Sequence, residues 1–229
     1  MRPIVALTMS CWLASAPAGA AVTYSFADFS AFTIVDASPN GSASLVAGAY
    51  LDATITLGSL PQRTFAYGIA YDAANRLDPA SFGPIGTIDM SVESFGCGLL
   101  GTFNSCGGSI QGFGLALEQG GQFFFHGFSA FTVDFPFWNT RSAAGLTAGS
   151  FTAVSGGVSL SGVHPDFSAS GAPIAFGLYM GNTDGPSGQI TETAYDNLQV
   201  TAFSPVPEPS GLALLATAGL TFAWRRRKG

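Results

Sequence analysis

The chain has 229 residues, of which 47% are hydrophobic and only 10% are charged, and its formal net charge is −6. Eight Lys and Arg stand against fourteen Asp and Glu, and four of the eight basic residues lie in the last five positions. Nucleic-acid binding needs clustered basic charge on the folded domain, so this balance excludes it. Electrostatic attachment of the domain to anionic lipid is disfavoured for the same reason.

The first twenty residues predict a secretory signal peptide. Arg2 gives a short positive start, residues 4–16 are mostly apolar, and residues 18–20 form an Ala-x-Ala cleavage site. We therefore expect signal peptidase and the export machinery as partners, with cleavage near Ala20. Residues 21–206 then keep three Arg, thirteen acidic residues and no Lys, for a net charge of −10. Such an acidic region favours solubility outside the cell.

Residues 21–204 predict one all-β domain, because they are rich in Gly, Ser, Thr, Phe and Val and apolar residues recur at every second position. This alternation is clearest in four groups: Phe65, Tyr67, Ile69 and Tyr71; Ile88, Met90 and Val92; Phe131, Val133, Phe135 and Phe137; and Ile174, Phe176, Leu178 and Met180. Ten to twelve short strands over this length fit a single β-sandwich of jelly-roll-like topology.

Turn signals divide the predicted strands. Clusters of Gly, Pro, Asn and Asp stand at residues 39–41, 78–79, 107–108, 120–121, 156–157 and 184–186. No long segment of the domain shows the 3.6-residue periodicity of an amphipathic helix, and no internal repeat is evident.

Cys97 and Cys106 are the two cysteines left after signal removal, and they flank a Gly-rich segment. An even pair in an exported chain predicts a disulfide, which would stabilise the domain by roughly 2–3 kcal/mol. Zinc would need further thiol or imidazole ligands close by, and a redox-active pair would have Cys-x-x-Cys spacing. Neither pattern occurs here.

Aromatic residues are abundant, with 20 Phe in the chain, and most of them alternate as core positions. Trp138 is the one Trp of the predicted domain. Tyr and Trp carry a polar handle that suits them to half-exposed contact surfaces, whereas Phe does not. Trp138 is therefore the candidate for an exposed ligand contact, with a glycan as the ligand.

No catalytic set emerges from the motifs. A nucleophile elbow, a P-loop, a dinucleotide fingerprint and a zinc-protease motif are all missing from the sequence. His126 and His164 lack a partner in a recognisable spacing, and Glu93, Glu118 and Glu192 are expected on solvated strand faces. We expect a protein that is not an enzyme and has no cofactor or metal.

Structural calcium is the one metal alternative. Residues 182–185 and 196–197 supply Asn and Asp oxygens that could converge at one end of the sandwich. Turn chemistry explains these residues equally well. The last strand is predicted at residues 192–202, and its Tyr-Asp-Asn-x-x-Val segment at 195–200 resembles the closing strand of exported jelly-roll modules, including carbohydrate-binding ones.

The tail at residues 205–229 has three parts: a Pro-rich break, an uncharged apolar run at residues 211–224 and a basic cluster. The prolines end the folded domain. The 14 residues of the apolar run would form roughly 21 Å of helix. This is a short membrane span, because a bilayer core is about 30 Å thick and usually takes about 20 residues. The basic cluster favours the cytoplasmic side, which leaves the domain outside.

This order resembles the PEP-CTERM sorting signal of exported bacterial proteins. The matching residues are Val206, Pro207, Glu208, Pro209, Arg225, Arg226 and Arg227. The resemblance implies an exosortase-type membrane protease as partner, cleavage near Pro207 to Pro209, and passage through the inner membrane to the cell surface or the medium. It also implies a host that makes extracellular polysaccharide, and it implies no activity for the domain.

Three functions are compatible with these observations. The first is an exported surface or matrix protein without enzymatic activity. The second is a carbohydrate-binding module for extracellular polysaccharide. The third is a polysaccharide-active hydrolase, which would need two carboxylates facing each other in a cleft.

Overall fold

The computed structural model describes residues 19–58, 65–98, 111–128, 138–155, 158–183 and 190–205. The domain is one compact unit, Ala20–Pro205. It is built almost entirely from antiparallel strands that form two sheets, which confirms the predicted all-β class. Within the described residues there are thirteen strands, slightly more than the ten to twelve expected.

The first sheet has six strands and is organised around the last one. Its order is β3-β4-β13-β6-β9, and β1 also pairs with β13. The first part of β13 pairs with β4 and its last part with β1, while β6 lies along its other side. The strands are β1 (Ala21–Phe26), β3 (Gly41–Ala47), β4 (Leu51–Leu57), β6 (Thr87–Gly98), β9 (Trp138–Leu146) and β13 (Ile190–Phe203).

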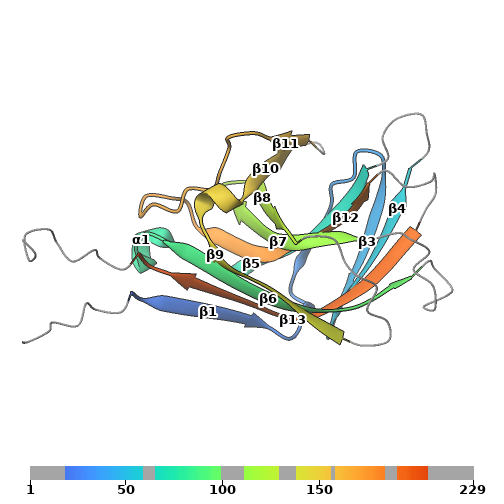
Figure 1. The fold of residues 1–229 in the computed structure, drawn as a ribbon, viewed down its shortest axis with the longest axis horizontal. Helices are drawn as coiled ribbons and strands as arrows, with labels where there is room; N and C mark the ends of the chain where they lie inside the picture. The colour runs from blue at the N-terminus through green and yellow to red at the C-terminus, as the bar shows by residue number, and fades with distance from the viewer. Residues whose placement is uncertain are drawn as a thin grey trace, which may run out of the picture. The chain divides into compact units, whose positions relative to one another are not determined.

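The second sheet has seven strands in the order β11-β10-β8-β7-β12-β5-β2. These are β2 (Thr33–Asp36), β5 (Phe65–Leu77), β7 (Gly112–Gln119), β8 (Gln122–Gly127), β10 (Thr152–Ser155), β11 (Val158–Leu160) and β12 (Ile174–Thr183). The described helical segments are short: α1 (Pro79–Phe82), which Asp78 caps, and the 3-10 turn η1 (Ala148–Ser150). Figure 1 shows the two sheets as layers.

The core lies between the inner faces of the two sheets. Tyr24 of β1 meets Phe176 of β12 with ring centroids 5.1 Å apart, and Phe113 of β7 meets Tyr195 of β13 at 5.3 Å. The predicted alternations on β6 and β12 point into this core, since the following side chains are all buried: Ile88, Met90, Val92, Ile174, Phe176, Leu178 and Met180. Their burial drives the two sheets together.

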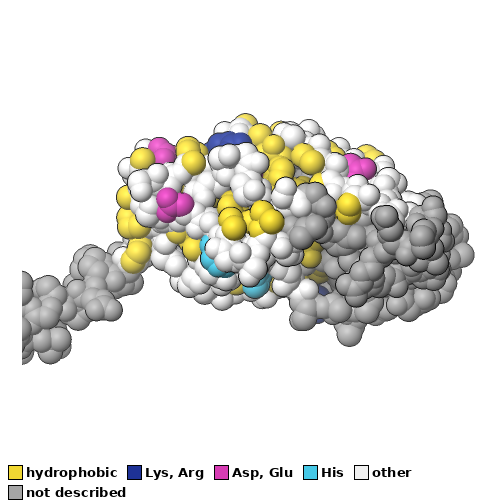
Figure 2. Space-filling model, turned by 90° about the horizontal axis from the view of Figure 1, so that it is seen from above, with side chains coloured by type: hydrophobic (Ala, Val, Ile, Leu, Met, Phe, Trp, Pro, Cys, Tyr) yellow, Lys and Arg dark blue, Asp and Glu magenta, His cyan; other side chains and the backbone are white. Residues whose placement is uncertain are grey.

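A second apolar cluster covers the outer face of the seven-stranded sheet. Its fully buried members are Tyr67, Ile69 and Ala116, and Phe125 stacks on Tyr179 with ring centroids 4.4 Å apart. The alternation predicted on β5 is therefore confirmed for Tyr67, Ile69 and Tyr71, which share one face, but it is the outer face. Figure 2 looks down on the molecule from above the view of Figure 1 and shows hydrophobic side chains interspersed with few charged ones.

The hairpin between β7 and β8 turns at Gly120 and Gly121, as the sequence indicates. Their φ angles are +61° and +83°, so both residues occupy the left-handed region. Positive φ at both central positions is the requirement of a type I′ turn, whose twist matches that of the flanking strands. Glycine meets this requirement without strain from a Cβ atom.

The two ends of the domain lie side by side. Ala21 of β1 pairs with Phe203 of β13, and the amide of Ser204 donates to the carbonyl of Ala20 at 2.8 Å. Both strand ends are at the left of Figure 1. The first and last residues of the domain are therefore adjacent at one end of the six-stranded sheet.

Several predictions fall outside the described residues. They are the signal peptide, the apolar helix and sorting residues of the tail, the Cys97–Cys106 disulfide, and the alternation at Phe131 to Phe137. None of the helices in the described part of the chain is long and apolar enough to cross a membrane.

Candidate functional site

One row of paired residues crosses four strands on the outer face of the six-stranded sheet. Trp138 of β9 lies opposite Phe95 of β6, and Phe95 lies opposite Ala194 of β13. Ala194 in turn lies opposite Asp52 of β4. The residues that alternate with them on β4, β6 and β13 are buried, and Trp138 is exposed, so these four side chains share the outer face; the buried neighbours are Leu51, Ala53, Ser94, Thr193 and Tyr195.

The row lines a cavity of about 270 Å³, which Tyr50 and Glu192 complete. Trp138 is 43% exposed and Tyr50 is 50% exposed, two of the highest values for large hydrophobic side chains among the described residues. Ala194 lies between Phe95 and Asp52, and its short side chain leaves the hollow open. Trp138 and Phe95 thus lie at one end of the row and Asp52 at the other, with Tyr50 two residues before Asp52.

Phe95 supports Trp138 within this row. Their ring centroids are 5.3 Å apart with an interplanar angle of 36°. Aromatic pairs at such a separation attract each other by about 0.5–1.5 kcal/mol beyond their buried area. The contact holds the indole in place while leaving much of its surface open to solvent.

Asp52 and Glu192 form an acidic pair. Glu192 pairs with Thr54, so it lies diagonally across from Asp52 on the adjacent strand, where Cα atoms are typically about 7–8 Å apart. Burial and the negative charge of Asp52 raise the pKa of Glu192, and burial raises the pKa of Asp52. Within the described ranges, no basic side chain forms a salt bridge with either carboxylate.

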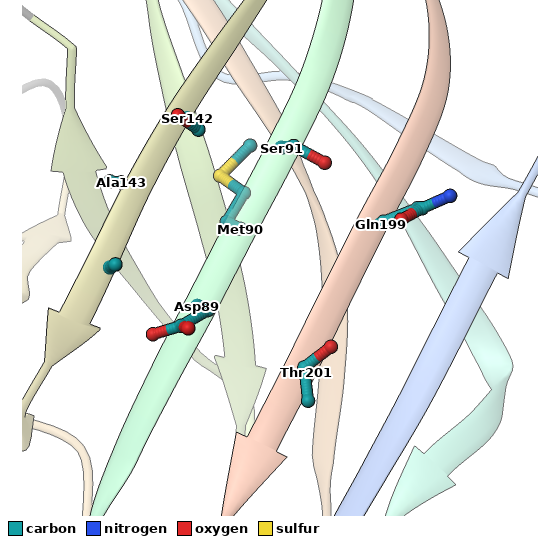
Figure 3. A pocket seen from close by; sticks show the side chains of 8 residues that line it. Asp89, Met90, Ser91, Ser142, Ala143, Gln199 and Thr201 are labelled. Carbon is teal, nitrogen blue, oxygen red and sulfur yellow. The ribbon is translucent and has the colours of Figure 1, made fainter.

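A second, polar cavity of about 220 Å³ lies on the same outer face (Figure 3). Ser91 and Gln199 face each other across β6 and β13, and Ser142 of β9 pairs with Ser91. Asp89 accepts a hydrogen bond from the amide of Gly145 at 2.7 Å. Ser91 is four residues from Phe95, or about 13 Å along the strand, so polar groups continue the face beyond the aromatic cavity.

Trp138 is exposed, as a ligand contact requires, although its role as a contact stays a prediction. Glu118 departs from expectation, because it is buried rather than solvated. The guanidinium of Arg76 reaches across Ala175 to within 2.5 Å of its carboxylate, and the amide of Gly121 donates to it at 2.7 Å. Glu118 is thus a structural ion-pair residue of the seven-stranded sheet.

The two histidines are engaged with the backbone. The Nδ1 atom of His126 lies 2.9 Å from the carbonyl oxygen of Ser150, and that of His164 lies 2.6 Å from the carbonyl oxygen of Phe151. In the part of the chain that the structure describes, no group of three or more His, Cys, Asp or Glu side chains could hold a metal ion.

The calcium hypothesis uses residues 182–185 and 196–197, and residues 184 and 185 lie outside the described ranges. At its other end, Asp196 accepts from the amide of Asn197 at 2.6 Å, and the Asn197 side chain donates to Glu93 at 2.8 Å. Asn197 has a φ of +50° beside an irregularity in β13. These hydrogen bonds give the side chains of Asp196 and Asn197 partners within the protein, as the turn explanation expects.

Sequence reasoning missed Tyr50, Asp52 and Phe95. The alternation of β4 placed Asp52 opposite to its buried neighbours, which indicates an outer-face position. The pairing of β4 with β13, and of β13 with β6, joins segments far apart in the chain. No local signal in the sequence specifies that pairing.

Comparison with protein families matches residues 205–228 to the PEP-CTERM protein-sorting motif. No curated protein matches the chain significantly. An all-β domain followed by this motif defines an exported protein that is directed to the cell surface. The motif also identifies the processing partner as an exosortase.

Proposed function

We propose that this protein is a non-enzymatic polysaccharide-binding protein of the cell surface or extracellular matrix. Signal peptidase removes residues 1–20, the tail holds the chain in the inner membrane for a time, and exosortase cleavage then passes the domain outward. The two sheets form a β-sandwich of jelly-roll-like type, and the cavity at Trp138 binds the glycan.

The observation that carries this proposal is the cavity that Trp138, Tyr50 and Phe95 share with Asp52 and Glu192. Sugar rings have apolar faces, which stack on aromatic rings, and hydroxyl groups at their edges, which donate to carboxylates. Binding sites commonly combine apolar walls with a few polar groups in this way. The polar face beyond the cavity offers hydrogen bonds to further units of a chain.

Intact mass tests the sorting half of the proposal. Protein recovered from the envelope and medium of a native-type host should span residue 21 to about Pro207, less the two hydrogens of a Cys97–Cys106 disulfide. A chain that retains residues 211–228 in every fraction would instead be a resident membrane protein.

Affinity electrophoresis in gels containing the host's exopolysaccharide tests the binding half. The protein should be retarded, and Trp138→Ala should abolish the retardation. Val163→Ala is the matched control, since Val163 is also 43% exposed but lies outside the cavity. Equal retardation of both variants would reject the site.

The acidic pair favours a second candidate, a glycoside hydrolase. Diagonal neighbours such as Asp52 and Glu192 typically have Cα atoms about 7–8 Å apart, which is compatible with the carboxyl separation of about 5–9.5 Å that glycosidases use. The raised pKa of Glu192 suits a general acid. Release of reducing ends from matrix polysaccharide, lost in Asp52→Asn and in Glu192→Gln, would select this function over simple binding.

A further inference from the structure

Among the described residues, no basic side chain forms a salt bridge with the acidic pair, although the pair lines a cavity rather than an open surface. The one Lys of the chain is Lys228 in the tail. Arg76 is committed to Glu118 in the other sheet. Two half-buried carboxylates on one face repel each other, and a cation bound in the cavity would relieve this repulsion.

We propose that the cavity recognises a protonated amino group on a sugar ring, so that the ligand is an amino-sugar polymer with free amines. This inference rests on the proposed glycan binding and names the class of glycan. Asp52 and Glu192 receive the ammonium group, while Trp138 and Phe95 receive the sugar ring.

The dimensions of the row fit this arrangement. Adjacent strands are about 4.8 Å apart, so Phe95 and Asp52 lie about 10 Å apart on either side of Ala194. That gap accommodates a ring that stacks on the aromatic side and extends a substituent to the carboxylate side.

The chemistry of an ammonium group also fits. It carries three donors and no acceptor, so one group can donate to both carboxylates at once. Charge-assisted hydrogen bonds are about twice as strong as neutral ones. Tyr50, which lies two residues before Asp52 and lines the same cavity, can add cation–π attraction of about 0.5–1 kcal/mol at an exposed site. An acetylated amine loses the charge and two of the donors.

Titration calorimetry with two matched oligosaccharides tests the proposal: a β-1,4-linked glucosamine tetramer and its N-acetylated counterpart. They share backbone and length and differ in charge. With the full chain at pH 6 and low salt, the free-amine tetramer should bind about tenfold more tightly. Asp52→Asn and Glu192→Gln should each remove most of this preference.

Two further variants make the test specific. Glu93→Gln removes one negative charge from the same face while keeping an acceptor for Asn197, so it should leave the preference unchanged. Ala194→Leu should abolish binding of both tetramers, because it fills the hollow between Phe95 and Asp52 without entering the core.

The outcomes separate the two proposals. Equal affinity for both tetramers, lost in Trp138→Ala, would overturn amine recognition and leave glycan binding intact. An equal loss in Glu93→Gln and Glu192→Gln would show diffuse attraction of a polycation to an acidic domain, which also overturns the inference. Failure of both tetramers and of exopolysaccharide to bind would reject the glycan function itself.

Discussion

Phe95 and Trp138 lie directly opposite each other on β6 and β9, with ring centroids 5.3 Å apart. Their contact makes the exposed indole a fixed surface rather than a freely rotating one. Fixing a contact residue before binding lowers the entropy that association must lose. In the proposed glycan site, Phe95 would therefore be a positioning residue for Trp138.

Removing the indole should weaken glycan binding while leaving the fold intact. For Trp138→Ala we expect at least a tenfold loss of affinity, since stacking aromatics dominate such contacts. Unfolding free energy should change by less than about 1 kcal/mol, because the side chain is 43% exposed. Phe95→Leu should cause a smaller loss of affinity by loosening Trp138. Calorimetry and denaturant unfolding measure the two effects, and a binding loss accompanied by global unfolding would contradict the assignment.

The acidic pair should make stability fall as pH rises. The folded-state pKa values of Asp52 and Glu192 are raised, so the folded protein binds more protons than the unfolded chain between the ordinary and the raised values. Stability decreases as pH rises through that window, and the cost persists above it.

Glu192→Gln removes this cost. We expect a gain of about 0.5 kcal/mol at pH 7 after solvent screening, or about 1–2 °C in Tm. The gain should vanish below about pH 4, where the carboxyl group is protonated in both states. Thermal melts of wild type and variant across this range test it, and a pH-independent difference would contradict the electrostatic cause.

Replacing the glycines of the β7–β8 turn by residues with a side chain should destabilise the domain. Gly121→Ala places a Cβ at a φ of +83° and should destabilise the domain by about 1 kcal/mol. Gly120→Asn should cost less, because Asn tolerates the left-handed region. Gly149→Ala serves as control, since it has no positive φ and its Cβ would lie 3.8 Å from the Thr147 hydroxyl. In urea unfolding, the Gly121→Ala variant should have a lower free energy of unfolding than the other two variants.

The ion pair between Arg76 and Glu118, which spans β12, should contribute more to stability than a surface ion pair does. Arg76→Ala leaves the Glu118 carboxylate buried with only the Gly121 amide, and we expect a loss of about 2 kcal/mol at pH 7. Adding Glu118→Gln should recover part of that loss. A double-mutant cycle in denaturant unfolding isolates the pair, and a coupling energy near zero would show that Arg76 acts only through its backbone contacts at Ala73 and Pro173.

The strands were predictable because period-two alternation reports local burial directly. Ile88, Met90 and Val92 illustrate this, since all three lie in the core. The same pattern did not reveal which face of β5 is inner, because Tyr67 and Ile69 are apolar on the outer face as well. A rule that assigns every apolar side chain to the core cannot detect a second apolar cluster on the outer face of a sheet.

The site was predictable only in part. Trp138 stood out by its residue type, yet Asp52 and Glu192 come together through the register of β4 and β13, which depends on long-range pairing. Glu118 was misplaced for a related reason: its partner Arg76 lies two strands away and reaches it over the small side chain of Ala175. Contacts between distant segments leave no local mark on the sequence.

The pairing of Ala21 with Phe203 determines how the domain is held. Ala194, in the floor of the cavity, is nine residues before Phe203 on β13, or about 30 Å along the strand. A chain attached through residue 205 is therefore joined to the end of β13 that lies away from the cavity. If the cavity binds a glycan as proposed, a tethered molecule could do so before its tail is cut, and matrix capture and release from the cell would then be independent events.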